Sequence, residues 1–454
     1  MNYDEFISTK KYKDEYFGFD IELEDIHPLL FAFQKDIVKW AIKKGRAAIF
    51  QDCGLGKTVQ QLEWARQIIN KESGSILILA PLAVSYQTIR EGKKIDIDVK
   101  LCKTQSDVVD GINITNYEKL HHFDPTKFIG IVLDESGILK NFNGKLRQDI
   151  QNFGEQINYR LCCTATPSPN DFMEIGTHVE FLGYMSRNQM LAEFFTHDSD
   201  NTQKWRLKKH AEGIFWEWMS KWCVAMQKPS DMGYDDGNFQ LPELIVEHEI
   251  IEITNLDDFV GVQTRTLNDR RRARKNSLKQ RVKRAAEIAN NYDGPVLVWC
   301  DLNDESEALA KSIKDSVEVA GKHSNEYKEK ALLGFSNNEI RVMVSKASIS
   351  GFGMNWQHCD RIIFVGLSDS YEQMYQAIRR CWRFGQKNSV HVTVIIGELE
   401  KNVLLNIQRK EKQAQTMFNA LVNCLKKYGL NRSKIEVKRY LPEKKMNLPK
   451  WMVK

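Results

Sequence analysis

The most constraining feature of this sequence is an apolar stretch that runs directly into a loop containing two glycines and ending in lysine. The segment reads AAIFQDCGLGKT and continues as VQQLEWARQI. Its first residues have the composition of a buried strand, and the stretch that starts at or just after Lys57 has the spacing of a helix. Gly54 and Gly56 allow backbone N–H groups to turn towards an anion, and the helix N-terminus adds a partial positive charge. The order of strand, loop and helix indicates an α/β fold with a phosphate site.

Residues of this loop are expected to bind ATP and Mg²⁺. Leu55 contributes its backbone between the two glycines, and Lys57 reaches the β- and γ-phosphates. The Thr58 hydroxyl is expected to ligate Mg²⁺. The full phosphate-loop pattern has glycine at position 51, where this chain has Gln51. The prediction therefore depends on the strand–loop–helix context as well as on the pattern.

Two long stretches of the chain alternate short apolar runs with polar segments. The first contains RAAIF, SILILAP, INITNYE, FIGIVLDE and YRLCCTAT, and the second contains PVLVWC, VEVAG, IRVMVS, RIIFVG and VHVTVII. Apolar runs of this length, rich in Ile and Val, are typical of buried parallel strands. We therefore expect two α/β domains, with LPELIVEHEIIEIT as a further strand that enters the second.

The segment between these stretches changes character. MSRNQMLAEFF and EGIFWEWMSKWCVAM are rich in aromatic residues and predict helices, so the segment is expected to be a helical insertion. The expected organisation is an N-terminal segment 1–24, an ATP-binding domain 25–170, a helical insertion 171–240, a second domain 241–400, and a basic C-terminal helix and tail 401–454.

Two adjacent carboxylates, Asp134 and Glu135, end the apolar run FIGIVLDE. A carboxylate at the carboxyl end of a strand can bind Mg²⁺ through water, and its neighbour can position an attacking water. We assign Asp134 to the metal and Glu135 to activation of water. Hydroxyls at Thr164 and Thr166, which end the next run, are candidates to couple this acidic loop to a nucleic-acid track.

A cluster of arginines follows the run RIIFVG in the segment SYEQMYQAIRRCWRFGQ. We expect this segment to be a helix in which Arg380 and Arg383, three residues apart, share one face. Two such guanidinium groups can stabilise charge on a transferring phosphoryl group. Gln376 is a further candidate for the site, whereas Arg379 is expected to point elsewhere and to be structural.

Basic residues are concentrated in two parts of the chain, although the net charge is only +5. Residues 401–454 contain fourteen Lys and Arg against three Glu, and residues 265–284 contain a single acid, Asp269. Concentrated cations suit a polyanionic partner because binding releases counterions. A solvated helix face is the alternative for either run considered alone.

Cysteine usage and hydropathy exclude several classes of protein. None of the nine cysteines forms a Cys-x-x-Cys pair, which argues against a zinc ribbon or a disulfide framework and favours a reducing cytosol. No apolar stretch approaches the ~20 residues of a membrane helix, and the polar, acidic N-terminus is unlike a signal peptide. A cytoplasmic protein with no membrane partner is expected.

The order of these motifs carries a resemblance. The set FQ, GLGKT, DESG, TATP, GFGMN and QAxxRxxRxGQ resembles the helicase superfamily that includes DEAD/DEAH-box proteins. DxGLGKTxQ together with QAxxRxxRFGQ is most similar to Swi/Snf-type double-strand DNA translocases. WCDLNDESEAL, the stretch from GFGMN to RFGQ, and NIQRKEKQA resemble the Swi/Snf-like helicases of bacteriophages and prophages. The resemblance covers roughly residues 30–415. If the gene belongs to a phage, as the resemblance implies, the expected location is the host cytoplasm.

This resemblance implies two tandem RecA-like parallel-sheet domains that hold ATP between them. It implies that Gln34 contacts adenine, that Arg380 and Arg383 are arginine fingers, and that Gln376 lies near the γ-phosphate. Gly353 lies in a glycine loop expected to touch both ATP and the nucleic-acid backbone. The residues implied to track the nucleic acid are Pro81, Thr115, Asn116 and Lys346.

The expected function is ATP-dependent movement along duplex or single-stranded DNA, in phage DNA replication, recombination or repair, with phage replication or recombination proteins as partners. Three alternatives stay open: an RNA helicase of the same fold, a motor subunit serving a nuclease or methyltransferase, and a nucleic-acid-binding protein that does not hydrolyse ATP. The superfamily's acidic motif usually ends in His, whereas Ser136 and Gly137 follow Glu135 here.

Overall fold

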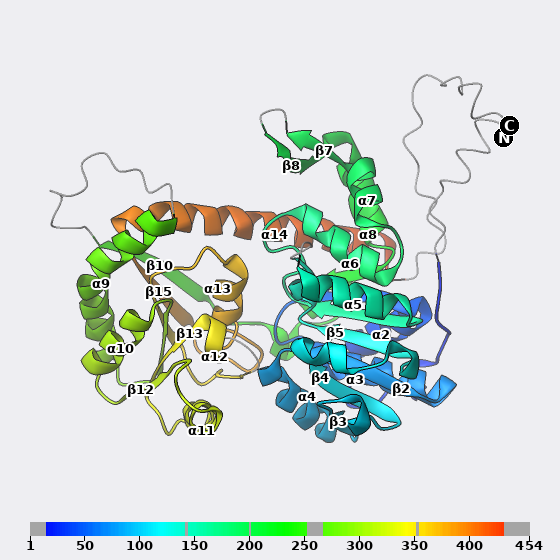
Figure 1. The fold of residues 1–454 in the computed structure, drawn as a ribbon, viewed down its shortest axis with the longest axis horizontal. Helices are drawn as coiled ribbons and strands as arrows, with labels where there is room; N and C mark the ends of the chain where they lie inside the picture. The colour runs from blue at the N-terminus through cyan, green and yellow to red at the C-terminus, as the bar shows by residue number, and fades with distance from the viewer. Residues whose placement is uncertain (1–14, 141–143, 199–200, 252–266, 351–353, 431–454) are drawn as a thin grey trace.

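The computed structural model describes residues 15–140, 144–198, 201–251, 267–350 and 354–430. Two lobes lie side by side, each built on a sheet with helices on both faces (Figure 1). The long helix α14 (Lys401–Tyr428) runs across both lobes. The expected α/β fold with two tandem RecA-like parallel-sheet domains is confirmed.

The first lobe contains a seven-stranded parallel sheet with the order β3-β4-β2-β5-β6-β1-β9. Its strands are β1 (Arg46–Gln51), β2 (Ser75–Ala80), β3 (Val99–Leu101), β4 (Gly111–Asn116), β5 (Gly130–Asp134), β6 (Tyr159–Thr164) and β9 (Cys223–Met226). The apolar runs correctly predicted β1, β2, β4, β5 and β6. The run at β3 was missed because it is only three residues long and lies at the half-exposed edge of the sheet.

Both faces of this sheet are covered, which explains why its strands are continuous apolar runs. Ala47 and Ile49 of β1 pack against one set of helices, and Ala48 and Phe50 pack against another set on the opposite face. The helices on the first face are α2 (Ala32–Lys44), α3 (Lys57–Glu72) and α4 (Leu82–Lys94). The helices on the second face are α5 (Lys145–Glu155), α6 (Ile175–Leu182), α7 (Arg187–Phe194) and α8 (Glu212–Met219).

The second lobe contains a six-stranded parallel sheet with the order β10-β15-β14-β11-β13-β12. Its strands are β10 (Leu244–Ile251), β11 (Val296–Cys300), β12 (Ser316–Val319), β13 (Val342–Lys346), β14 (Arg361–Val365) and β15 (Val390–Gly397). All six coincide with apolar runs in the sequence. The helices of this lobe are α9 (Leu267–Asn290), α10 (Asn303–Ser312), α11 (Asn325–Ser336), α12 (Ala347–Ser350) and α13 (Tyr371–Ile378).

The segment 171–240 is not purely helical, contrary to the expectation from its aromatic residues. It contains α6, α7 and α8, but also an antiparallel hairpin of β7 (Phe195–Asp198) and β8 (Asn201–Leu207). The end of the stretch EGIFWEWMSKWCVAM was wrongly predicted as helix, because Cys223–Met226 forms β9 and pairs with β1. The apolar composition of CVAM suits a buried strand as well as a buried helix, and periodicity cannot separate the two over four residues.

Helix α14 joins the cores of the two lobes. Val403 and Ile407, near its start, belong to the core of the second lobe, whereas Phe418 and Leu421 belong to the core of the first. These residues recur at intervals of three and four, so they form one apolar stripe along the helix. The part of the basic C-terminal segment from residue 431 onward lies outside the described residues.

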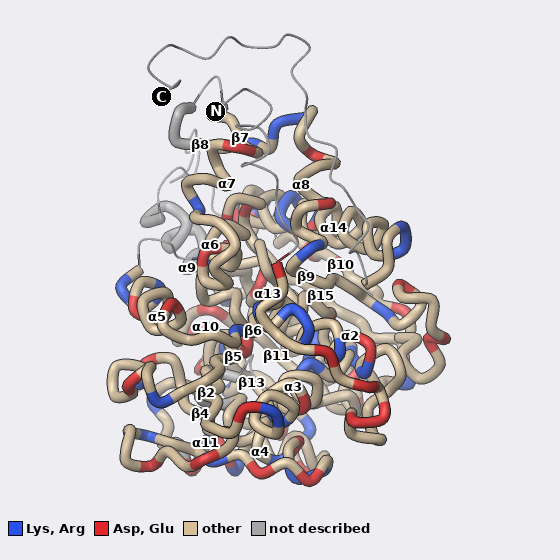
Figure 2. The backbone as a smooth tube through the Cα atoms, turned by 90° about the vertical axis from the view of Figure 1, so that its right-hand side faces the viewer, with Lys and Arg blue, Asp and Glu red and all other residues tan. Residues whose placement is uncertain are grey.

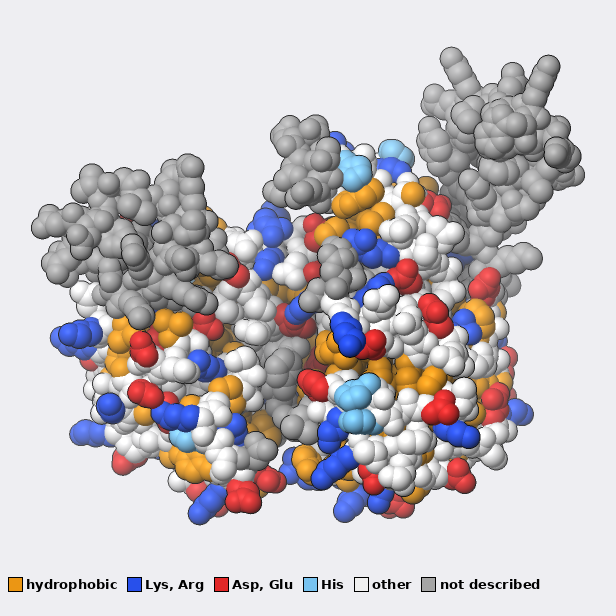
Figure 3. Space-filling view, viewed as in Figure 1, with side chains coloured by type: hydrophobic (Ala, Val, Ile, Leu, Met, Phe, Trp, Pro, Cys, Tyr) orange, Lys and Arg blue, Asp and Glu red, His pale blue; other side chains and the backbone are white. Residues whose placement is uncertain are grey.

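Charged residues of both signs are interspersed over the two lobes (Figures 2 and 3). From Leu267 onward the basic run 265–284 lies in α9, and the side chains before Ser277 are outside the described part. Arg281 is fully buried and donates to Glu305 at 2.8 Å, and Arg284 pairs with Glu249 at 2.6 Å. These two arginines therefore stabilise the second lobe, whereas Lys279 and Lys283 are exposed.

All nine cysteines are described and carry free thiols, as expected. In the part of the chain that the structure describes, no helix has the length and apolar character needed to cross a membrane.

Candidate active site between the two lobes

The glycine-bearing loop lies between the end of β1 and the start of α3, as predicted. Gly54 has a φ of 90° and Gly56 a φ of 78°, in the left-handed region that favours glycine. Lys57 is the first residue of α3, and its Nζ donates to the backbone carbonyls of Gln51 at 2.9 Å and Asp52 at 3.1 Å. Thr58 lies in the first turn of the same helix. The loop therefore directs a helix N-terminus and an ammonium group to one place.

Two buried glutamines, Gln51 and Gln34, support this loop through hydrogen bonds. Gln51, which replaces the glycine of the pattern, exchanges hydrogen bonds of 2.8 and 3.1 Å with Gln60 of α3. Gln34 donates from Nε2 to the Leu55 carbonyl at 2.9 Å, and its Oε1 accepts from the Phe31 N–H. Both polar groups of Gln34 are thus paired within the lobe. Its contact with adenine stays a prediction, while its support of the loop is an observed contact.

The acidic loop follows β5 and lies at the same edge of the sheet, because β1 and β5 both end there. Asp134 and Glu135 are close to Lys57, whose charge lowers the pKa of each carboxyl. Burial has the larger effect and raises both, bringing the pKa of Glu135 to about 7. A pKa near neutrality suits a general base. Glu135 also has a φ of 56°, which is rare for a residue with a side chain and is often found at functional sites.

Thr164 ends β6 and Thr166 follows it, next to the acidic loop. The Thr164 hydroxyl donates to Glu135 Oε2 at 3.3 Å, and the Thr166 hydroxyl donates to Glu372 Oε1 at 3.1 Å. Glu372 belongs to α13 in the second lobe. These hydroxyls therefore lie between the acidic loop and the opposite lobe.

The helix predicted to carry all the arginines ends earlier than expected. α13 stops at Ile378, and Arg380 and Arg383 lie in the turns that follow, so the prediction of one shared helical face is wrong. Beyond the end of the helix, the Trp356 N–H donates to the Arg380 carbonyl at 2.8 Å, and Gln386 Nε2 donates to the Cys381 carbonyl at 3.3 Å.

The two arginines nevertheless converge. Arg380 and Arg383 both donate to the Met354 carbonyl, at 3.3 and 3.4 Å. Burial lowers the pKa of both guanidinium groups, whereas the electrostatic influence of Cys53 in the glycine-bearing loop raises the pKa of each. Glu135 also raises the pKa of Arg380. Arg380 and Arg383 therefore lie close to the glycine-bearing loop of the first lobe, and Arg380 also lies close to Glu135.

Several contacts across this gap involve residues that the sequence analysis did not assign to the site. Asp52 forms a buried ion pair with Arg379 and accepts a hydrogen bond from the Tyr375 hydroxyl. Gln376, which the sequence analysis did assign to the site, places Nε2 3.5 Å from Glu135 Oε2. Arg379, expected to be structural, thus binds the glycine-bearing loop directly. A signal was present, because Glu372, Tyr375, Gln376 and Arg379 have the spacing of one helical face.

The predicted nucleic-acid contacts lie at the carboxyl edges of the two sheets. Pro81 follows β2, and Thr115 and Asn116 end the neighbouring strand β4, where Asn116 pairs with Ala80. Thr115 is fully buried, backbone and side chain alike, so it is not accessible to a ligand in this structure. Lys346 ends β13 in the second lobe. Gly353 lies outside the described residues.

The donor set fits ATP with Mg²⁺. Two glycines with positive φ, a helix N-terminus and Lys57 suit the phosphates of a nucleotide. Asp134 and Thr58 supply oxygen atoms of the kind that Mg²⁺ binds, and the burial of Asp134 without a full countercharge favours a cation there.

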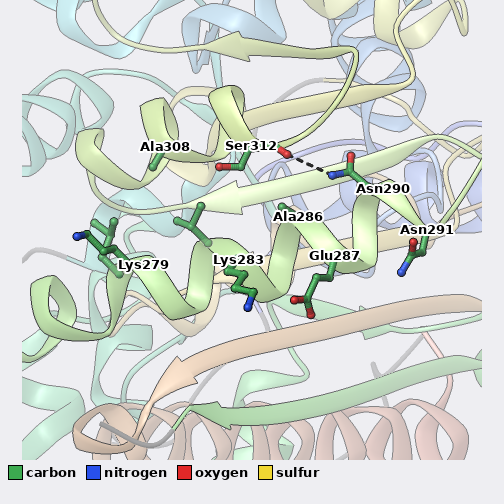
Figure 4. Close-up of a pocket in the computed structure, with 10 residues that line it drawn as sticks. Lys279, Lys283, Ala286, Glu287, Asn290, Asn291, Ala308 and Ser312 are labelled. Carbon is green, nitrogen blue, oxygen red and sulfur yellow. Dashed lines mark hydrogen bonds between the residues drawn. The ribbon is translucent and has the colours of Figure 1, made fainter. Parts of the chain in front are cut away.

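A second concave surface lies elsewhere. A groove of about 560 Å³ is formed by α9 and α10 on the second lobe, and Lys279, Lys283 and Glu287 lie along it (Figure 4). Asn290 donates to the Ser312 carbonyl at 3.2 Å across it. The groove contains none of the predicted site residues, so the gap between the lobes is the stronger candidate for the active site.

Comparison with known proteins finds one family match in each half of the chain. A SNF2-related domain matches residues 33–212, and a helicase conserved C-terminal domain matches residues 276–385. The CHD3-type chromatin-remodeling factor CHR7 of Arabidopsis thaliana is 22% identical over 211 residues, which is 39% of this chain and 17% of that protein. The match thus spans about a sixth of that relative's length.

Among solved structures, the SWI2/SNF2 ATPase core of Sulfolobus solfataricus in complex with dsDNA is 19% identical. The match covers 88% of this chain and 96% of that chain, with a TM-score of 0.43. The two matched domains follow each other along the chain, and each coincides with most of one lobe. Residues 33–212 are therefore similar to a SNF2-related domain, and residues 276–385 are similar to a helicase conserved C-terminal domain.

Proposed function

We propose that this protein is a nucleic-acid-dependent ATPase that hydrolyses ATP between its two lobes and thereby moves along DNA. The observation that carries the proposal is the division of the site. Lys57, Asp134 and Glu135 lie on the first lobe, and Gln376 and the Arg380 region of the second lobe face them. A site divided in this way is complete only when the lobes are together, so hydrolysis can be coupled to their movement.

Each residue has a separate part in hydrolysis. Lys57 and the loop N–H groups bind the phosphates, and Glu135 accepts a proton from the water that attacks the γ-phosphorus. Arg380 and Arg383 stabilise the negative charge that develops as the bond to the leaving ADP oxygen breaks. Mg²⁺ held near Thr58 and Asp134 neutralises phosphate charge when bound.

Movement follows from two grips on the nucleic-acid backbone. Pro81 and Asn116 on the first lobe and Lys346 on the second lie at carboxyl edges of the two sheets, and opening and closing of the lobes changes the distance between them. Contacts of this kind are made with phosphates and sugars, so little sequence specificity and a steep decrease of affinity with salt are expected.

The choice of DNA is supported by the pairing of DCGLGKTVQ with QAIRRCWRFGQ and by the SNF2-related domain match. The finer assignment to a phage or prophage type, acting in replication, recombination or repair, is supported by the motif sequences of the second lobe.

The test is an ATPase assay of the whole chain with duplex DNA, single-stranded DNA or RNA as the stimulator. Strong stimulation by DNA is expected, and Lys57→Ala should abolish ATP binding and turnover because the phosphates lose their ammonium partner. Stimulation by RNA alone would overturn the choice of DNA. Absence of hydrolysis with all three would leave a binding protein or a subunit that needs its partner enzyme.

A further inference from the structure

One face of α13 makes a series of polar contacts with the first lobe. Glu372, Tyr375 and Gln376 lie on α13, and Arg379 is the residue that caps its C-terminal end. The spacing i, i+3, i+4 and i+7 brings the four side chains to the same side. Each binds a residue of the first lobe: Glu372 binds Lys140 and Thr166, Tyr375 and Arg379 bind Asp52, and Gln376 contacts Glu135.

These contacts hold two different loops. Asp52 is part of the glycine-bearing loop and is bound near the C-terminal end of α13. Lys140 ends the 3₁₀ helix Ser136–Lys140, which directly follows Glu135, and it is bound near the N-terminal end of α13. The Glu372 side chain is only 12% exposed, so this ion pair lies inside the interface. Glu135 therefore lies between two anchored loops.

Gly137 provides the space for the Glu372 contact. A Cβ atom at position 137 would lie 2.7 Å from Glu372 Oε1 and 3.3 Å from the Thr166 carbonyl. The first distance requires the Glu372 carboxylate to shift, and the second is tighter than most contacts of a Cβ atom, so a larger side chain at this position would displace the carboxylate. Gly137 stands in the part of the acidic motif where the superfamily usually has His. In this chain the Glu372 carboxylate of the second lobe occupies that space.

We propose that Glu372 is a positioning residue, which acts through Lys140 and Thr166 to hold the acidic loop in the arrangement that hydrolyses ATP. Glu372 does not contact the phosphates in this role. It makes the position of Glu135 depend on whether the second lobe is docked, and it thereby couples lobe closure to hydrolysis. The inference rests on the proposed ATPase function of the same site.

The first test compares the kinetics of Glu372→Gln with those of the wild type. Loss of the ion pair should lower kcat at saturating DNA at least tenfold and leave the KM for ATP within about threefold, because the phosphate-binding loop is still anchored through Asp52. The stimulation by DNA should decrease by a larger factor than the basal rate. An unchanged kcat in a wild-type background that hydrolyses ATP would overturn the inference.

The second test uses Gly137→Ala and the double variant Gly137→Ala/Glu372→Gln. The added methyl group should displace the Glu372 carboxylate and reproduce the loss of kcat seen with Glu372→Gln. If both changes act through one contact, the double variant should be no slower than the slower single variant. Losses that multiply would show that the two residues act separately and would overturn the inference.

The third test is an exchange of charges, Lys140→Glu with Glu372→Lys. Each single reversal should lower kcat more than tenfold because like charges then meet, and the double exchange should restore kcat to within about threefold of the wild type. A double exchange as slow as the single reversals, in a protein with wild-type circular dichroism and Tm, would overturn the inference. The matched control is the exchange of Glu398 and Lys401, an exposed pair 3.2 Å apart within the second lobe, which should leave all rates unchanged.

Different results would refute the proposed function and the role of Glu372. A wild-type protein without any ATPase activity, with or without DNA, refutes the proposed function. An active wild type whose Glu372→Gln and Gly137→Ala variants keep the full kcat refutes only the role of Glu372.

Discussion

Gln51 shows how a departure from a motif can be accommodated by a single residue. Its side chain is fully buried, where it exchanges two hydrogen bonds with Gln60 and contacts Met226 Sδ at 3.3 Å. Glycine at this position would leave Gln60 Oε1 without its donor, whereas Gln60 Nε2 would still donate to the Leu55 carbonyl at 3.1 Å. Where the pattern has a flexible glycine, this chain therefore has a pair of reciprocal hydrogen bonds that links β1 to α3.

We predict that Gln51→Ala lowers the free energy of unfolding by about 1–3 kcal/mol, because it leaves a buried amide partly unpaired. Urea denaturation measures the change. Gln148→Ala, at an exposed position of α5, is the control and should change stability by less than about 0.5 kcal/mol. Equal effects of the two variants would contradict the role given to the buried pair.

His178 makes stability depend on pH. It is fully buried, its Nε2 lies 3.1 Å from the Ser136 hydroxyl, and burial lowers its pKa from 6.5 to about 4. The unfolded chain therefore binds a proton more readily than the folded protein does between these two values. The contribution of His178 to the free energy of unfolding is therefore complete above pH 6.5 and is lost as the pH falls towards 4.

We predict that the wild type loses about 2 kcal/mol more stability than His178→Gln between pH 7 and pH 5. The glutamine amide can still bond to Ser136 but does not take up a proton. Urea denaturation at the two pH values gives the difference, and the many other titrating groups cancel because both proteins contain them. Parallel pH profiles for the two proteins would show that His178 is protonated in the fold without cost.

At the scale of elements, the loops and turns after strands carry the chemistry. The turns after α13 bring Arg380 and Arg383 together at the Met354 carbonyl, although they are not on a helix. Arg380 faces Glu135, whereas Arg379 is held by Asp52. Of these two neighbouring residues, Arg380 thus serves the phosphates and Arg379 serves the loop that binds them.

We predict that Arg380→Ala lowers kcat by ~10³ and leaves ATP affinity within a few fold, because the guanidinium acts mainly on charge that develops during transfer. Single-turnover kinetics and nucleotide-binding titrations separate the two quantities. Arg409→Ala, an exposed arginine of α14, is the control and should keep the wild-type rate. Normal turnover in Arg380→Ala would refute its assignment as an arginine finger.

The sequence predicted the elements whose signal is local. Eleven strands were visible as apolar runs because parallel strands buried on both faces need continuous apolar residues. The hairpin of β7 and β8 was missed, as was β9, which follows an aromatic helix without a turn residue. The motif residues Lys57, Asp134 and Glu135 were found for the same reason, because strand, loop and helix are adjacent along the chain.

Contacts across the gap could not be predicted in the same way. Asp52 and Arg379 are separated by 327 residues, and Thr166 and Glu372 by 206. Nothing local to either residue indicates its partner, and each taken alone reads as an ordinary charged or polar side chain. The periodicity of α13 indicated a shared face, but only the packing of the lobes shows what that face binds.

At the scale of the whole molecule, α14 limits how far the lobes can separate. It is continuous over 28 residues and is buried in the core of both lobes. Polar contacts add to its attachment on the first lobe, where Gln415 exchanges hydrogen bonds with Gln227 and Tyr428 donates to Glu217 at 2.6 Å. Opening of the gap therefore requires that α14 bends or that one of its ends is released.

We predict that Phe418→Ala, which removes a buried ring from the attachment to the first lobe, costs about 3 kcal/mol of stability and increases the radius of gyration of the free protein. Leu405→Ala on the same helix is the control, because Leu405 is 62% exposed and its removal should change neither quantity. Urea denaturation and small-angle X-ray scattering provide the two measurements. A radius of gyration that stays at the wild-type value despite the lost stability would show that contacts such as Asp52–Arg379 hold the lobes together without α14. In that case the loss of closure should instead follow Arg379→Ala.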